Sequence, residues 1–455
     1  MKKVKKLFTL LTALCMSLML PVQVMAAVDL NAKYEVDTNK IQGWPQAADI
    51  ASDTGILMDA DTGAVLFDKG GDQQRYPASI TKIMTLLVAV ENSSMDEQVT
   101  FTETGVRNVT ADSSNINSKI GEVMTMQDCL HALIIQSAND AAAQIAEHVG
   151  GTEQNFIDMM NQRAAQIGCT NTHFTNSSGL PDENHYSSAK DMALIFREGL
   201  KNEAFRSVIG DADYTIKPTN MTSDKRVFHT HHPMFAPESD IYYQGCIGGK
   251  TGFTNLAAHT LVTAVEQNGT TYIAVVMHGV ELSTCCLDSK ALFDYGFKNF
   301  TKTAVDGGSV ILPNGMDVNT LTTKSESNNG KVDTVYYVGD HQVGNSTVDE
   351  PAATPTPEAA VSEAAGQTAA SGTTGNTSDE SAGTDNSSDS GTSSGEVSQN
   401  SKNTQDTRST TAGEEGETKG IPALRKILLM VMAVMVLILI ALLAALGRKE
   451  RKHRR

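Results

Sequence analysis

The clearest hydrophobic pattern in the chain lies between Pro77 and Val90. Apolar side chains there occupy nearly every angle of a helical wheel, and the stretch contains no glycine. A helix of this kind is buried on all sides, whereas a surface helix keeps one polar face. Pro77 suits a helix start, where the missing N–H donor is tolerated. The pattern therefore predicts a helix that begins at Pro77 and lies in the centre of a domain.

Strand and helix patterns flank this stretch. Before it, residues 55–58 and 64–67 are typical of two strands that an Asp- and Gly-rich turn joins. After it, helical periodicity predicts four helices, over residues 126–135, 141–149, 156–167 and 189–200. Asp140 is placed to cap the second of these helices, so Ser137 and Asn139 are expected in a sharp connection between two helices.

Strand patterns return after this helical region. Strands are expected over residues 247–253, 258–266 and 271–277, and Asn268-Gly269 between the last two is a strong hairpin signal. A closing helix is expected over residues 287–300. Residues 301–350 contain only short apolar clusters, which predict a small β-rich extension. Residues 351–420 are Ser, Thr, Gly and acidic residues with few large apolar groups, so a disordered linker with an r.m.s. span of about 45–50 Å is expected.

The two ends of the chain carry apolar stretches of a different kind. Residues 1–26 combine four lysines, an apolar run and Val24-Met25-Ala26, which is typical of a secretory signal peptide. Residues 427–446 form an uninterrupted apolar stretch of 20 residues, long enough to span a membrane as a helix. Residues 447–455 are strongly basic and are expected in the cytoplasm. The sequence thus predicts a single-pass protein of the cell membrane whose folded part faces the outside.

Charge and cysteine content narrow the choice of function. Residues 27–420 carry 24 basic and 52 acidic side chains, so no basic surface is available to attract nucleic acid. Five cysteines remain after the predicted signal peptide, and an odd number with no C-x-x-C pair indicates neither a disulfide framework nor a zinc site. His229, His231 and His232 lack acidic or cysteine partners at ligand spacing, and we expect a loop there and not a metal site. Cys246 is expected to be a buried structural thiol, and no cofactor is expected.

The candidate chemistry begins at the start of the predicted central helix. Ser79 and Lys82, three residues apart, project from the same face of its first turn. Serine is a weak nucleophile unless a base takes its proton, and lysine can be that base when burial lowers its pKa. A second Ser-x-x-Lys at Ser187–Lys190 is followed by a segment of mixed polarity, and we treat it as a chance match.

Two further motifs follow in chain order. Ser137-x-Asn139 lies in the predicted helix connection, with Ser113-x-Asn115 as a competing copy, and Lys250-Thr251-Gly252 lies on a predicted strand. The set Ser-x-x-Lys, Ser-x-Asn and Lys-Thr-Gly, in that order, is known from β-lactamases and penicillin-binding proteins.

The sequence around the motifs resembles the serine-type D-alanyl-D-alanine carboxypeptidases, which are low-molecular-mass penicillin-binding proteins. The resemblance covers about residues 45–300 and includes residues 78–85, 137–142, 172–181 and 248–254. It implies an α+β, β-lactamase/D,D-peptidase-like fold, in which an antiparallel sheet flanked by helices adjoins a helical subdomain within a catalytic domain of residues 27–300. The implied substrate is a peptidoglycan stem peptide that ends in D-Ala-D-Ala, and the implied inhibitors are β-lactam antibiotics.

The resemblance also implies a role for each motif residue. Ser79 attacks the carbonyl between the two D-alanines, and Lys82 accepts its proton while Lys250 helps to keep Lys82 neutral. Ser137 relays a proton towards the leaving amine, and Asn139 holds the substrate amide and orients Lys82.

The remaining implied roles concern substrate binding. The N–H groups of Ser79 and Phe253 form the oxyanion hole, and Thr251 binds the substrate carboxylate. The implied substrate-binding residues are Lys250, Thr251, Gly252 and Phe253.

One departure keeps alternatives open. Cys285 stands where many members of the family carry an arginine that fits recognition of the terminal carboxylate. A catalytically silent wall-binding protein of the same fold therefore remains an alternative. A β-lactamase is a weaker one, because Thr172 stands where a deacylating glutamate is expected.

Overall fold

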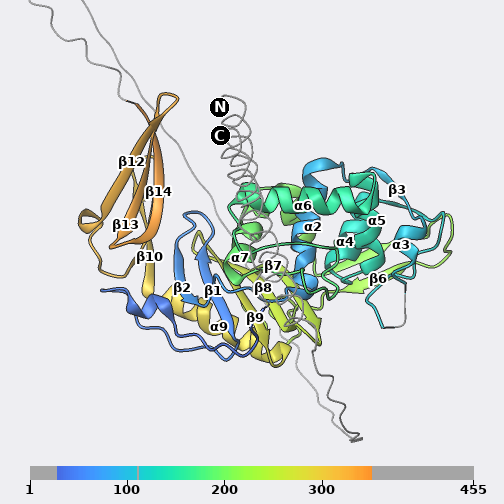
Figure 1. Ribbon diagram of the computed structural model, residues 1–455, viewed down its shortest axis with the longest axis horizontal. Coiled ribbons are helices and arrows are strands. Elements are labelled where there is room, and N and C mark those ends of the chain that lie inside the picture. The colour runs from blue at the N-terminus through green and yellow to red at the C-terminus, as the bar shows by residue number, and fades with distance from the viewer. Residues whose placement is uncertain (1–27, 110–111, 351–455) are drawn as a thin grey trace, which may run out of the picture. The chain divides into compact units, whose positions relative to one another are not determined.

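The computed structural model describes residues 28–109 and 112–350 (Figure 1). The predicted signal peptide, the linker of residues 351–420, the membrane span of residues 427–446 and the basic tail all lie outside these residues. Among the helices that the structure does describe, none has both the length and the apolar content that crossing a membrane requires.

A five-stranded antiparallel sheet lies at the centre of the fold, with the strand order β2-β1-β9-β8-β7. Its strands are β1 (Thr54–Asp59), β2 (Val65–Lys69), β7 (Cys246–Thr254), β8 (Ala258–Gln267) and β9 (Thr270–Gly279). The predicted hairpin between β8 and β9 is confirmed: Asn268 and Gly269 have φ angles of 52° and 74°, the left-handed values that this tight turn requires. β7 forms one edge of the sheet.

Helices cover both faces of the sheet. α9 (Leu282–Asn299) packs against β8 and β9, and α7 (Ala189–Gly199) packs against β1 and β9 (Figure 1). The other α-helices of the described residues are α2 (Lys82–Asn92), α3 (Glu103–Val106), α4 (Met126–Ile134), α5 (Asn139–Gly150), α6 (Glu153–Ile167) and α8 (Glu203–Ile209). Two small antiparallel pairs of strands accompany them. β3 (Gln98–Thr100) pairs with β4 (Val123–Thr125), and β5 (Asp213–Ile216) pairs with β6 (Arg226–His229).

The two-residue periodicity of the strands divides the interior into two hydrophobic cores. On β9, Ile273 and Val275 belong to the core that also contains α2 and α7, while Tyr272 and Ala274 belong to the core beneath α9. Successive side chains on a strand point to opposite faces, so a strand covered on both faces needs apolar residues at every position. This explains why β9 shows a continuous apolar run without polar alternation.

The predicted central helix is buried as expected, but it does not begin at Pro77. Ala78–Thr81 form a 3₁₀ turn, η2, and the α-helix α2 starts at Lys82. Ala78 has a φ of 51°, which is incompatible with a regular helix start. The hydroxyl of Thr260 on β8 donates a hydrogen bond of 2.9 Å to the carbonyl of Pro77, so contact with the sheet holds the chain in this turn.

The predicted helix cap at Asp140 is wrong. α5 begins at Asn139, one residue before Asp140, with Ala138 at the N-cap and no side-chain cap. The Asp140 carboxylate instead accepts hydrogen bonds of 3.2 Å from the N–H groups of Ile116 and Ser118, and so holds the loop that precedes β4.

Residues 300–349 form a second antiparallel sheet with the order β10-β11-β14-β13-β12. Its strands are β10 (Phe300–Val305), β11 (Gly308–Pro313), β12 (Thr322–Asn328), β13 (Lys331–Val338) and β14 (His341–Asp349). The Trp44 ring contacts the rings of Phe300 and His341 with centroids 5.0 and 4.8 Å apart, and a ring nitrogen of His341 is hydrogen-bonded to the carbonyl of Val65 on β2. These contacts connect the second sheet to the first.

We predict that replacing Phe293 by alanine lowers the free energy of unfolding by about 3–5 kcal/mol, because its fully buried ring fills the core beneath α9. Leu287 on the same helix is 57% exposed and serves as the matched control. Its replacement by alanine should change stability by about 0.5 kcal/mol or less. Denaturant unfolding followed by circular dichroism measures both. Equal losses in the two variants would contradict this packing.

Candidate active site

The side chain of Lys82 lies at the centre of a buried cluster of polar groups. Its Nζ is 3.1 Å from Ser79 Oγ, 2.7 Å from Asn139 Oδ1 and 2.6 Å from the main-chain carbonyl oxygen of Ser178. Lys82 is fully buried. Residues from three segments that are far apart in the sequence therefore contact the amine of Lys82.

The surroundings of this amine favour its neutral form. Burial is the largest cause that lowers the pKa of Lys82 well below its ordinary value, and the positive charge of Lys250 lowers it further. The negative charge of Asp140 opposes this shift. A neutral lysine beside a serine hydroxyl can accept the proton of that hydroxyl, which is the activation that a serine nucleophile requires.

Gly252 allows the edge strand β7 to approach the turn that carries Ser79. A Cβ atom at Gly252 would lie 2.9 Å from the Ser79 nitrogen and 2.4 Å from Thr260 Oγ1, closer than packed atoms tolerate. Only glycine fits at this position, and the backbones of η2 and β7 therefore lie side by side. This contact brings the N–H of Ser79 close to the strand that carries Phe253.

Ser137 lies in the connection between α4 and α5, as predicted, and Asn139 is the first residue of α5. Ser137 has a φ of 59°, a left-handed conformation that is strained for a residue with a side chain. The Asn139 N–H donates a hydrogen bond of 2.8 Å to the carbonyl of Ser114, and its side-chain amide donates one of 3.4 Å to Ser113 Oγ. The competing Ser113-x-Asn115 motif is thus part of the support for Asn139.

Lys250 and Thr251 lie on β7 at the edge of the sheet. Lys250 is 2% exposed, and burial lowers its pKa to about 7, so it is partly charged at neutral pH. Phe253 is 55% exposed and its ring packs on that of His259 with centroids 4.5 Å apart. Lys250 and Thr251 line a small hollow together with His231.

The contact between Lys82 and the Ser178 carbonyl could not be predicted from the sequence. A main-chain oxygen carries no residue-specific signal, although residues 172–181 were among the segments behind the resemblance. Asn176 Oδ1 accepts hydrogen bonds from the N–H groups of Ser178, Gly179 and Leu180, and this turn holds the carbonyl against Lys82. Within residues 172–181, Asn176 is therefore the residue whose side chain accounts for the position of the Ser178 carbonyl.

Comparisons with known proteins agree with this geometry. A family model described as D-alanyl-D-alanine carboxypeptidase matches residues 41–280, which is more than half of the chain. The chain belongs to the D-alanyl-D-alanine carboxypeptidase family.

Individual relatives come from several bacteria. D-alanyl-D-alanine carboxypeptidase DacF of Bacillus subtilis (strain 168) is 35% identical over 227 residues, which are 49% of this chain and 56% of that protein. The D-alanyl-D-alanine carboxypeptidase of Streptomyces sp. (strain K15) is 31% identical over 257 residues, which are 54% of this chain and 88% of that protein.

Solved structures confirm the expected fold. The Streptomyces K15 DD-transpeptidase matches with a TM-score of 0.52 at 29% identity, covering 56% of this chain and 100% of that one. Penicillin binding protein 6B from Escherichia coli matches with a TM-score of 0.57 at 25% identity, covering 68% of this chain and 98% of that one.

This member of the carboxypeptidase family departs from the expected pattern at Cys285. The Cys285 thiol is fully buried, 3.5 Å from the carbonyl oxygen of His259 and 4.0 Å from Ser52 Oγ. Burial is the main cause that raises its pKa to about 11, so the thiol is uncharged. The position where the resemblance implies an arginine in many members of the family therefore contributes no charge here.

The other sequence candidates lie outside the cluster. Lys190 of the second Ser-x-x-Lys pairs with Asp72, and Thr172 donates to Asp191. His229 pairs with Asp213, while His232 is buried against Thr263.

Metal and disulfide chemistry have no support in the part of the chain that the structure describes. No three His, Cys, Asp or Glu side chains gather there as metal ligands, and its five cysteines are unpaired. Burial raises the pKa of Cys246 to about 12, which makes a reactive thiolate unfavourable.

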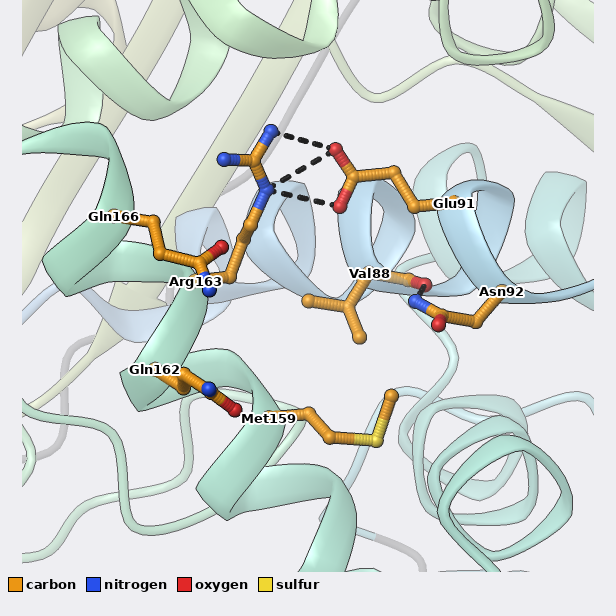
Figure 2. Close-up of a pocket in the computed structure, with 7 residues that line it drawn as sticks. All are labelled: Val88, Glu91, Asn92, Met159, Gln162, Arg163 and Gln166. Atoms are coloured by element: carbon orange, nitrogen blue, oxygen red, sulfur yellow. Dashed lines mark hydrogen bonds and ion pairs between the residues drawn. The ribbon is translucent and has the colours of Figure 1, made fainter.

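A hollow of about 350 Å³ between α2 and α6 is not the active site. Figure 2 shows Arg163 of α6 reaching across it to the carboxylate of Glu91 on α2. Its other lining residues are Val88, Asn92, Met159, Gln162 and Gln166. No serine, threonine or cysteine that could act as a nucleophile is among these lining residues.

We predict that replacing Lys250 by glutamine moves the rising limb of the pH–acylation profile to higher pH. The charge of Lys250 disfavours a second charge on Lys82, so its removal raises the pKa of Lys82 and less of the amine is neutral at a given pH. Lys250→Arg keeps the charge and is the matched control. Acylation by a fluorescent penicillin, measured between pH 5 and 10, gives the profile. An unmoved limb in Lys250→Gln would contradict the coupling.

Proposed function

We propose that this protein is a serine D-alanyl-D-alanine carboxypeptidase that removes the terminal D-alanine from peptidoglycan stem peptides and is inhibited by penicillins. The observation that carries the proposal is the buried amine of Lys82, held 3.1 Å from Ser79 Oγ by two hydrogen-bond acceptors. The family and the fold support the same activity.

In the first step, Ser79 Oγ attacks the carbonyl carbon between the two D-alanines while neutral Lys82 takes the Oγ proton. The oxygen of the tetrahedral intermediate is negatively charged, and the N–H groups of Ser79 and Phe253 are the proposed donors to it. The close approach that Gly252 permits supports this assignment.

The C–N bond then breaks, and the leaving amine of D-alanine receives a proton through Ser137. The peptide remains bound to Ser79 as an ester. Water attacks this ester with Lys82 as the base, which releases the shortened stem peptide and restores Ser79. Asn139 holds the substrate amide, and Lys250 and Thr251 are the proposed partners of the terminal carboxylate.

The alternatives have less support. A silent wall-binding protein would have no chemical use for Lys82, because burying an amine so deeply that its pKa falls well below the ordinary value costs stability. A β-lactamase would need a carboxylate to activate the deacylating water, and Thr172 is engaged with Asp191 instead.

Covalent labelling tests the nucleophile and the base. We predict that fluorescent penicillin labels the purified protein, that Ser79→Ala abolishes the label, and that Lys82→Ala slows labelling by about 10²–10⁴-fold, the usual contribution of a general base. Ser187→Ala in the second Ser-x-x-Lys is the matched control and should leave the label unchanged.

Substrate turnover tests the reaction itself. Release of free D-alanine from diacetyl-L-Lys-D-Ala-D-Ala should be lost in the same variants that lose the label. Labelling that survives Ser79→Ala would rule out this nucleophile. Labelling without release of D-alanine would exclude the carboxypeptidase activity and favour a penicillin-binding protein of another kind.

The proposed location is the outer face of the cell membrane, with residues 1–26 as signal peptide and residues 427–446 as the single membrane span. The basic residues 448–455 support a cytoplasmic C-terminus. A linker over residues 351–420 would allow the enzyme to reach the wall from this anchor.

Limited proteolysis tests this topology. In intact cells whose wall has been removed, an added protease should cut within residues 351–420, release the catalytic domain and leave a C-terminal fragment in the membrane. A domain that stays protected until the membrane is broken would show that the orientation is wrong.

A further inference from the structure

His185 lies behind the turn that carries Ser79 and does not belong to any of the three motifs. It is 2% exposed and is located in the segment between α6 and α7. One ring nitrogen, Nε2, lies 2.8 Å from Thr81 Oγ1, and the other, Nδ1, lies 3.0 Å from the Thr175 nitrogen. The ring therefore joins the two ends of the loop formed by residues 175–185 and connects them to η2, the turn that contains Ser79 and Thr81.

The two hydrogen bonds define the state of the ring. The Thr175 N–H can only donate, so Nδ1 is the acceptor and carries no proton. Nε2 then carries the proton and donates it to Thr81. Burial lowers the pKa of His185 to about 3, so the ring is neutral at neutral pH.

The loop that His185 closes presents two carbonyl oxygens to α2. The Ser178 carbonyl accepts a hydrogen bond of 2.6 Å from Lys82 Nζ, and the Ser177 carbonyl accepts one of 2.6 Å from Thr85 Oγ1. Gly179 packs so closely on η2 that a Cβ atom would lie 1.8 Å from the Ala78 carbonyl oxygen and 2.9 Å from Thr81 Oγ1. The loop and the turn thus fit together through Thr81.

The position of the Ser178 carbonyl decides where the Lys82 lone pair points. A neutral amine has two N–H donors and one lone pair in a tetrahedral arrangement. Asn139 Oδ1 and the Ser178 carbonyl are acceptors only, and at 2.7 and 2.6 Å they take the two N–H groups. The remaining direction faces Ser79 Oγ at 3.1 Å, where the lone pair can receive the hydroxyl proton. Without one of the acceptors, the amine can rotate and turn an N–H towards Ser79.

We propose that His185 is a positioning residue for the Lys82 base. It holds the loop of residues 175–185 on Thr81, and the loop in turn holds the Ser178 carbonyl on Lys82 so that the lone pair faces Ser79. The inference rests on the proposed function, since it assigns a role within the acylation step. His185 itself touches neither Ser79 nor Lys82 through any hydrogen bond of the described structure, and it acts through Thr81 and Ser178.

The test separates the acylation rate constant from the affinity for penicillin in the full-length protein. His185→Leu removes both ring hydrogen bonds, and we expect the rate constant to fall by about 10- to 100-fold, the effect of a misplaced reacting group, while the dissociation constant changes by about threefold or less. Thr81→Val removes the same contact from the other side and should give a similar loss. Since the two changes act on one contact, the double variant should be hardly slower than either single variant.

Two further variants distinguish a role of His185 in positioning Lys82 from a role in the stability of the fold alone. His185→Gln retains a donor and an acceptor, and should recover most of the lost rate. His131 is also fully buried, with hydrogen bonds to the Gln127 carbonyl and to Asp211, but it lies on α4 outside the site. His131→Leu should lower the melting temperature without lowering the rate constant of the folded molecules.

Specific results would overturn the role of His185. One such result is an acylation rate constant of His185→Leu, measured per folded molecule, that lies within threefold of the rate constant of His131→Leu. The other is a His185→Leu variant in which only the dissociation constant for penicillin is impaired. Failure of the proposed function gives a different result, since the unaltered protein would then not be labelled or would be labelled without Ser79.

Discussion

A lysine amine removed from water beside a serine hydroxyl is the interaction on which the rest of the site depends. A charged amine without water is costly, so burial shifts Lys82 towards the neutral form that can act as a base. A neutral amine in a buried place still needs acceptors for its two N–H groups, and Asn139 and the Ser178 carbonyl provide them. The apolar surface on every side of α2 excludes the water that would otherwise restore the charge. The feature that makes α2 a core helix is therefore also what favours the neutral form of Lys82.

Bringing three segments to one amine requires strained backbone. Ala78 and Ser137 both have φ angles near +50 to +60°, at 51° and 59°, although both carry side chains. Each strained residue is next to a group that the site uses, and each is held by neighbours outside its own segment. Thr260 on β8 holds the carbonyl of Pro77, and the Ser114 carbonyl holds the N–H of Asn139. The sheet and the helices around it thus supply the energy that keeps the turn and the loop in place.

Much of this arrangement could be predicted from the sequence, and the failures have physical causes. The strands, the hairpin at Asn268-Gly269 and the burial of the central helix follow from periodicity and turn chemistry, which are local. The family and its fold are confirmed, while the roles of the motif residues remain predictions. The start of the central helix was wrong because tertiary contacts with β7 and β8 override the local preference of Pro77. The cap at Asp140 was wrong because a carboxylate can serve a neighbouring loop as well as its own helix. The Ser178 carbonyl could not be predicted, since a main-chain atom has no letter in the sequence.

Cys285 bears on how the substrate carboxylate is recognised. An uncharged thiol whose sulfur is engaged with the His259 carbonyl offers neither the charge nor the forked donor geometry of an arginine. Among the residues assigned to substrate binding, Lys250 is then the one that carries a positive charge, and this charge also lowers the pKa of Lys82. In the proposed mechanism the terminal carboxylate would bind beside Lys250, so the ammonium that disfavours a second charge on Lys82 would also anchor the substrate. In the proposed mechanism, recognition of the terminal carboxylate and proton transfer from Ser79 would therefore both depend on one lysine, Lys250.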